Sequence, residues 1–222
     1  MDMNKNMWRI AGCCVVGSLL LISYGLNGVS PYLNQADAQS TRELEMPFLE
    51  EWASSGHADH TAEAFSHWDQ NVPQRIPEEC AKCHSTPGYL DFLGVDGSPA
   101  RHVDAPAPVG TTVECIACHN EVAMTMDSVV MPSGLEITGL GEEARCMQCH
   151  QGQASKFTVD AAIDKVNLPD PDTVSPDLEF VNIHYYAAVA TKYGTMAKSG
   201  YEYYGKTYDT HFSHITDLDP CI

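Results

Sequence analysis

The feature that most constrains this chain is a five-residue pattern, Cys-x-x-Cys-His, that occurs three times. The copies lie at residues 80–84, 115–119 and 146–150, so they start 35 and 31 residues apart. Each copy places two thiols and one imidazole on a very short stretch of chain. Each can therefore hold a group covalently through sulfur and ligate a metal ion through nitrogen.

We interpret the pattern as the attachment signature of c-type haem, in which the thiols bond the two vinyl groups and the His ligates the iron. A zinc site or a redox dithiol is the alternative. Zinc needs four ligands and does not require His directly after the second Cys, and a redox dithiol normally occurs once. Since His is 10 of 222 residues, three such coincidences have a chance on the order of one in ten thousand. The predicted haem residues are Cys80, Cys83, His84, Cys115, Cys118, His119, Cys146, Cys149 and His150.

The composition predicts a fold with a small conventional core. Gly and Pro supply 29 of the 222 residues, and long irregular runs separate the motifs, which disfavours a large sheet or helix bundle. Short helices are expected just before the third motif and again after it. We therefore expect a mainly α fold with extensive loops, in which haems form the core. Of the nine Cys, only Cys13, Cys14 and Cys221 lie outside the motifs, so no even set remains for a disulfide framework.

The net charge of −18 excludes nucleic acid as a partner, because no basic surface would meet the phosphates. The charge suits a carrier that meets redox partners through complementary charge. Solubility alone would explain it equally well.

Residues 1–38 have the order of a secretory signal, with Lys5 and Arg9 before an apolar run over 10–26 and a small-x-small site at 36–38. An uncleaved membrane anchor over residues 10–29 is the alternative, since about 20 apolar residues can span a bilayer. Both place the rest of the chain, 39–222, in the periplasm or on the outer face of the cytoplasmic membrane. Only this N-terminal segment is expected to touch a membrane.

Three His precede the first motif, and we expect them to supply a second axial ligand. A helix predicted over residues 55–68 would place His57, His60 and His67 along one stripe. We select His57 and His67 as iron ligands, with His60 as the spare. The alternative is that they are surface His on a polar helix.

A second helix is predicted over residues 182–199, with Gly200 as its stop. His184 would lie in its first turn, on the same side as the small residues Ala188 and Thr191. That position would let a haem approach, so we expect His184 to be an iron ligand.

The end of the sequence contains an isolated Cys221, which we read as the first half of a fourth attachment motif that the sequence does not complete. His214 would then serve as an axial ligand for that haem or for a neighbouring one. The expected cofactor is therefore haem c, with three complete sites and an incomplete fourth.

The motifs and their flanks resemble bacterial multihaem c-type cytochromes. The resemblance covers roughly residues 50–222 and rests on the motifs together with residues 55–58, 150–152 and 182–185. It implies a loop-rich, mostly helical fold, low-spin haems with two His ligands each, and a place in an extracytoplasmic respiratory chain.

The function expected from these observations is electron transfer between haems and redox partner proteins, namely a quinol-oxidising complex, other cytochromes or a terminal reductase. The seven His outside the motifs are enough to fill three sixth ligand positions, so an electron carrier is favoured over an enzyme. The alternative is a haem reductase or oxidase of a small nitrogen or sulfur oxyanion, or the electron-delivery subunit of such an enzyme.

Overall fold

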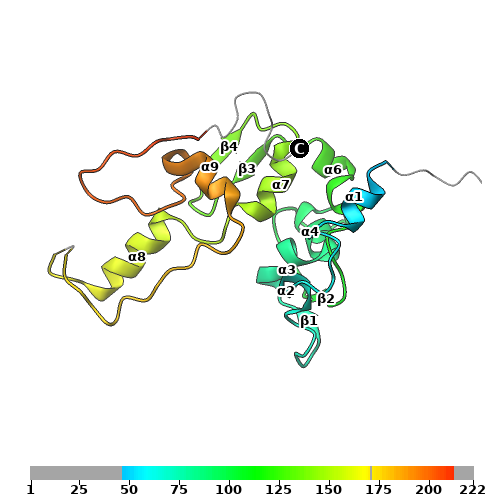
Figure 1. Cartoon of the computed structure of the whole chain (residues 1–222), viewed down its shortest axis with the longest axis horizontal. Helices are drawn as coiled ribbons and strands as arrows, with labels where there is room; N and C mark the ends of the chain where they lie inside the picture. Colours follow the sequence, from blue (N-terminus) through cyan, green and yellow to red (C-terminus); the bar gives the residue numbers. More distant parts are fainter. Residues whose placement is uncertain (1–46, 171, 213–222) are drawn as a thin grey trace, which may run out of the picture. The chain divides into compact units, whose positions relative to one another are not determined.

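The computed structural model describes residues 47–170 and 172–212. The chain divides into two units, Met1–Met46 and Pro47–Ile222, and every described residue belongs to the second. Of the described residues 37% are helical and 6% lie in strands. This confirms the mainly α fold with extensive loops (Figure 1).

The elements are short. The helices are α1 Leu49–Ala53, α2 Glu63–Ser66, α3 Glu78–His84, α4 Thr86–Leu93, α5 Cys115–Cys118, α6 Glu121–Met124, α7 Glu143–His150, α8 Lys156–Val166 and α9 Ala188–Ala197. The strands are β1 Arg75–Ile76, β2 Ala107–Pro108, β3 Ser128–Val130 and β4 Glu136–Thr138. The pairs β1–β2 and β3–β4 are antiparallel. Each Cys-x-x-Cys-His motif therefore lies in or at the end of a helix, namely α3, α5 and α7.

The first motif helix, α3, is fixed by close packing against α4. The Ser85 hydroxyl accepts from the Gly88 N–H at 3.0 Å and donates to the Ala81 carbonyl at 2.9 Å, so one side chain both caps α4 and ties it to α3. A Cβ on Gly88 would lie 2.4 Å from the Ala81 carbonyl oxygen. Only glycine allows the two helices to approach this closely.

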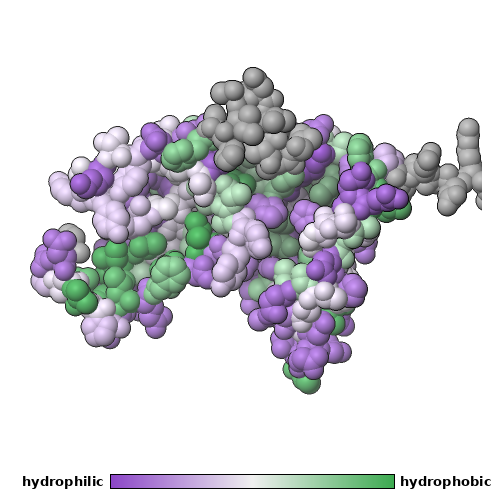
Figure 2. Space-filling view, viewed as in Figure 1, coloured by the Kyte–Doolittle hydropathy of each residue, from purple (hydrophilic) through white to green (hydrophobic). Residues whose placement is uncertain are grey.

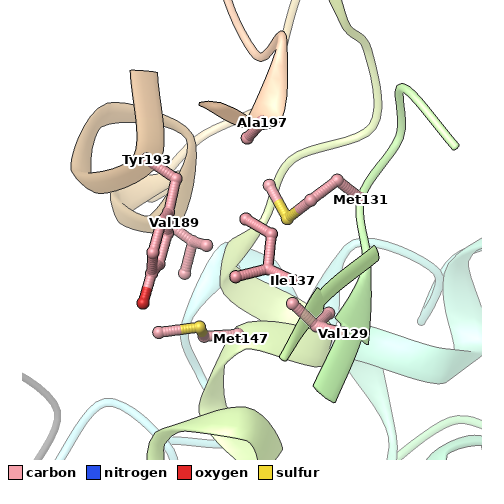
Figure 3. Packing of buried hydrophobic residues seen from close by; sticks show 7 residues of the cluster. All are labelled: Val129, Met131, Ile137, Met147, Val189, Tyr193 and Ala197. Atoms are coloured by element: carbon pink, nitrogen blue, oxygen red, sulfur yellow. The ribbon is translucent and has the colours of Figure 1, made fainter. Parts of the chain in front are cut away.

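The buried hydrophobic residues form three small clusters, and each cluster includes residues of a motif helix. The largest joins β3, β4, α7 and α9 (Figure 3), and comprises Val129, Met131, Ile137, Met147, Val189, Tyr193 and Ala197. The second joins α3 to the β1–β2 pair through Trp68, Ile76, Ala81, Val103 and Ala107. The third joins α4, α5 and α6 through Tyr89, Leu93, Ala117 and Ala123.

Much hydrophobic surface is left uncovered among the described residues. Twelve buried hydrophobic residues other than alanine stand against 21 large hydrophobic residues that are exposed. No residue of helix α8 is fully buried, and Phe157 at its start is exposed. Figure 2 shows hydrophobic residues gathered on the face where α8 lies. Contiguous exposed apolar patches are typical of interaction or ligand-binding surfaces.

Two predicted helices are wrong in extent. Within residues 55–68 only α2 is helical, and the chain on its N-terminal side runs in turns, so His57 and His67 do not share a helix stripe. The helix predicted over 182–199 begins only at Ala188 and ends at the left-handed C-cap Lys198, not at Gly200. His184 precedes it, with φ of 88°. Within the described part of the chain, no helix is both long and apolar enough to cross a membrane.

Candidate functional site

The first and third motifs meet at their second cysteines. The Cys149 thiol donates to the Lys82 carbonyl oxygen at 3.6 Å, and it lies close enough to the Cys83 thiol for each to shift the pKa of the other. The Cys149 thiol stabilises the Cys83 thiolate and lowers its pKa to about 7. The pKa of Cys149 is raised by Cys83 and by burial. The two motifs, 66 residues apart in sequence, therefore form one site.

Tyr89 of α4 lies where the three motifs converge. Burial raises the pKa of its phenol first, and the thiols of Cys149, Cys118, Cys146 and Cys83 raise it further. The hydroxyl donates to the Arg145 carbonyl oxygen at 3.1 Å, which satisfies its one donor inside the protein. Tyr89 is thus a buried contact point among cysteines of all three motifs.

The motif imidazole His84 faces His184. Their ring centroids lie 5.7 Å apart and the rings are nearly perpendicular, at 89°. Nδ1 of His84 is 2.7 Å from the Ala64 carbonyl oxygen, to which it donates, so the lone pair lies on Nε2. Burial lowers the pKa of His84 below its usual value, and the neighbouring His184 and His67 lower it further, against the raising effect of the Ala64 bond. The ring is therefore held neutral, the form that ligates a metal.

The motif imidazole His150 faces His57 in the same manner. The ring centroids are 6.0 Å apart, with an interplanar angle of 51°. Nδ1 of His150 lies 3.0 Å from the Tyr186 carbonyl oxygen, which again leaves Nε2 with its lone pair. The pKa of His57 is lowered by burial and by His150. His57 and His150 are therefore a second pair of adjacent imidazoles.

Both centroid separations are those of ordinary ring packing, and both are also close to the separation that two imidazoles on one metal ion would have. Two metal–nitrogen bonds of about 2.0 Å, plus roughly 1 Å from each nitrogen to its ring centre, give roughly 6 Å between centroids. A ligating His normally donates its other N–H to a backbone carbonyl or a carboxylate, which fixes the tautomer and the ring orientation. His84 and His150 both have this second bond.

The second motif differs. His119 is exposed, and among the described residues no imidazole is in ring contact with it. Two methionines follow it, and their sulfur atoms accept hydrogen bonds from side chains of α7. Arg145 donates to Met124 at 3.0 Å and Gln148 to Met126 at 3.2 Å. Met124 therefore links α6 to α7, and Met126 links the chain just after α6 to the same helix.

Two other His near the first motif, His67 and His60, form no such pair with a motif imidazole among the described residues. Nδ1 of His67 bonds Glu63 Oε1 at 2.8 Å, and its ring packs edge-on against Trp68 at 4.9 Å. His60 is exposed. His214 and Cys221 lie outside the described residues.

Three features of the site were missed by the sequence reasoning. Trp68 packs against His84 with ring centroids 5.3 Å apart, and its place beside His67 in sequence could have suggested this. The carbonyl oxygens of Ala64 and Tyr186 orient the motif imidazoles, and no side-chain pattern reports backbone acceptors of this kind.

Comparison of the chain with protein-family models, with curated proteins and with solved structures gives no match. Within the described residues, no three or more His, Cys, Asp and Glu side chains converge as a metal-binding group. An axial pair has only two side-chain ligands and is smaller than such a group. What the arrangement can do chemically is to hold a metal between two imidazoles at two places, each beside a pair of thiols.

Proposed function

We propose that this protein is a multihaem c-type cytochrome that carries electrons between redox partner proteins outside the cytoplasm. The observation that carries the proposal is the pairing of two motif His with two non-motif His at about the separation that one iron requires. In both pairs the Nδ1 of the motif His is bonded to a backbone carbonyl, so Nε2 is available.

The residues of the three motifs could hold three haem groups. The first haem would be held by Cys80 and Cys83, with His84 and His184 as axial ligands. The third would be held by Cys146 and Cys149, with His150 and His57 as ligands. Cys115, Cys118 and His119 would hold the second. The uncovered apolar surface supports this assignment, because a porphyrin is a large apolar plate that such surface would cover.

When bound, haem supplies a reversible one-electron iron couple. The chain's own residues decide what that couple can do. Two imidazoles at the first and third sites leave no position for a substrate, so those sites favour electron transfer over catalysis. The carbonyls of Ala64 and Tyr186 fix the imidazole orientation and raise ligand basicity.

The second candidate function is reduction or oxidation of a small nitrogen or sulfur oxyanion at the second motif. It rests on His119, which is exposed and, among the described residues, has no imidazole in ring contact. The charge of this region argues against it. Residues 102–144 contain seven carboxylates and no Lys or Arg. Ion pairs with Arg101, Arg145 and Lys192 neutralise three of the seven, and the other four disfavour an anion. Electron transfer is therefore the function we favour.

The test is to express the chain with a c-type maturation system and to measure the haem content from the pyridine haemochrome and the intact mass. Three haems per chain are expected, and the variant Cys146→Ala/Cys149→Ala should carry one fewer. Colourless protein, or protein that carries zinc, would refute the proposal. Rapid binding of carbon monoxide to one ferrous haem would favour the enzyme, whereas three unreactive haems would favour the carrier.

A further inference from the structure

The segment of residues 182–187, here called the ligand segment, serves both imidazole pairs at once. His184 belongs to it and faces His84 at 5.7 Å. Two residues later, the Tyr186 carbonyl accepts from Nδ1 of His150 at 3.0 Å. One short stretch of chain therefore places an imidazole beside His84 and a hydrogen-bond acceptor beside His150.

The ligand segment has an unusual backbone. His184 and Tyr186 both have positive φ, at 88° and 54°, a conformation that costs a non-glycine residue free energy and persists only where the surroundings enforce it. The Tyr186 side chain is 87% exposed, so side-chain burial does not enforce it. What holds the segment is backbone contact.

That contact is made with the chain just after the third motif. Gln153 N–H donates to the Ile183 carbonyl at 2.9 Å. Gly152 has φ of 85°, and a Cβ there would lie 2.7 Å from the same carbonyl oxygen. The close approach at Gly152 therefore fixes the position of the segment against α7.

The cysteines bring the same two sites together on another side. The Cys149 thiol of the third motif donates to the carbonyl oxygen of Lys82 in the first motif at 3.6 Å, so the two segments that would attach the cofactors are in contact. Within the described part of the chain, no hydrogen bond or ring contact joins the ligand segment to residues 115–119 of the second motif.

We propose that the ligand segment clamps the first and third sites into one coupled redox pair, and that the second site, which the segment does not contact, does not respond to changes in the segment. This rests on the proposed function, since it assigns coupling to two of the three haem sites. The two coupled sites are not consecutive in sequence, because the second motif lies between them. An electron on one member of the pair makes reduction of the other less favourable, and the two apparent potentials then belong to the pair.

The test is a spectroelectrochemical titration of the matured full chain. His184→Met and His57→Met each raise the potential of the haem whose ligand they replace, because Met raises the potential relative to His. These two variants label the waves of the first and third haems. Two further variants then disturb the clamp without altering a ligand. Tyr186→Pro cannot adopt positive φ, and Gly152→Ala pushes the ligand segment away from α7.

Each clamp variant has a matched control. Tyr186→Asn removes the same exposed side chain but accepts a left-handed backbone. Gly97→Ala introduces alanine at a comparable φ of 95°, where no atom lies within 4 Å of the added Cβ. Both controls should leave all three waves at their wild-type potentials.

The expected result is that both clamp variants shift the waves of the first and third haems and leave the wave of the second haem unchanged. Loss of the first and third low-spin signals, with the second haem retained, would support the clamp equally. Movement of one labelled wave alone, of all three, or of none would overturn it, as would loss of all haems in both variants. Wild-type protein without haem would instead refute the proposed function, so the two failures are distinguishable.

Discussion

The ion pair between Lys192 and Glu143 offers the sharpest test of the packing around the third motif. Lys192 lies on α9 and Glu143 in the first turn of α7, the helix that carries the motif. The Lys192 ammonium donates to Glu143 Oε2. The side chains are only 19% and 7% exposed, and Glu143 Oε1 has no hydrogen-bond partner. The variant Lys192→Met would leave this carboxylate buried and unpaired.

Removing one partner of a buried ion pair costs about 3–5 kcal/mol, because the remaining charge stays in a poorly solvated place. Lys192 is the more accessible partner, so water can reach part of the space it leaves, which favours the lower end of that range. The ammonium also lies 5.5 Å from the centre of the Tyr193 ring, a contact worth about 0.5–1 kcal/mol. We expect Lys192→Met to lower the free energy of unfolding by about 3–4 kcal/mol.

The measurement is denaturant unfolding of the matured protein, followed by far-ultraviolet circular dichroism, with the slope of the transition checked for constancy. The double variant Lys192→Met/Glu143→Leu removes both charges and should recover most of the loss. Lys206→Met, at an exposed position, is the control and should change stability by less than about 0.5 kcal/mol. A loss below about 1 kcal/mol for Lys192→Met, or a double variant no more stable than the single one, would show that the pair is not buried as described.

Three further outcomes follow from the same structure. In the haem-free chain, alkylation of Cys83 should follow a thiolate pKa of about 7, and Cys149→Ala should move the pH profile upward, because the thiol that lowers this pKa is lost; an unchanged profile would contradict the contact. Gly88→Ala should lower stability by at least about 1 kcal/mol, since its Cβ meets Ala81 at 2.4 Å; an unchanged melting temperature would count against the α3–α4 packing. Electron exchange with a cationic cytochrome should slow as salt rises, because residues 102–144 bear seven carboxylates and no Lys or Arg; a rate independent of salt would exclude this region as the approach surface.

Two of the ligands predicted from the sequence, His57 and His184, lie beside motif imidazoles in the structure. Neither lies in a helix, although each was selected from its position in a predicted helix. Helix periodicity predicts the direction of a side chain only where local propensity sets the backbone around it. Non-local backbone bonds set it instead. The His57 carbonyl accepts from Val113 N–H at 3.1 Å, and the Ile183 carbonyl from Gln153. Their ligation of iron remains a prediction.

The motif positions and the helical, loop-rich fold could be predicted because both follow from composition and short-range spacing. The pairing of particular His could not, because it depends on which loops meet. The Tyr186 carbonyl reaches His150 only because Gly152 lets the backbone at Ile183 approach. A glycine in a loop is compatible with many turns, and its sequence position does not reveal which chain it will contact.

The shortness of the motif helices points to a link between folding and cofactor attachment. Helices α3, α5 and α7 have seven, four and eight residues, and isolated helices below about 12–15 residues are marginal in water. They must therefore be stabilised by packing, yet the described residues expose more large hydrophobic side chains than they bury. A covalently held apolar group would supply the missing contacts, and a group that binds the folded chain stabilises it. If the proposed function is right, the motif residues that hold the haems also stabilise the fold, because the haems supply contacts that the side chains lack.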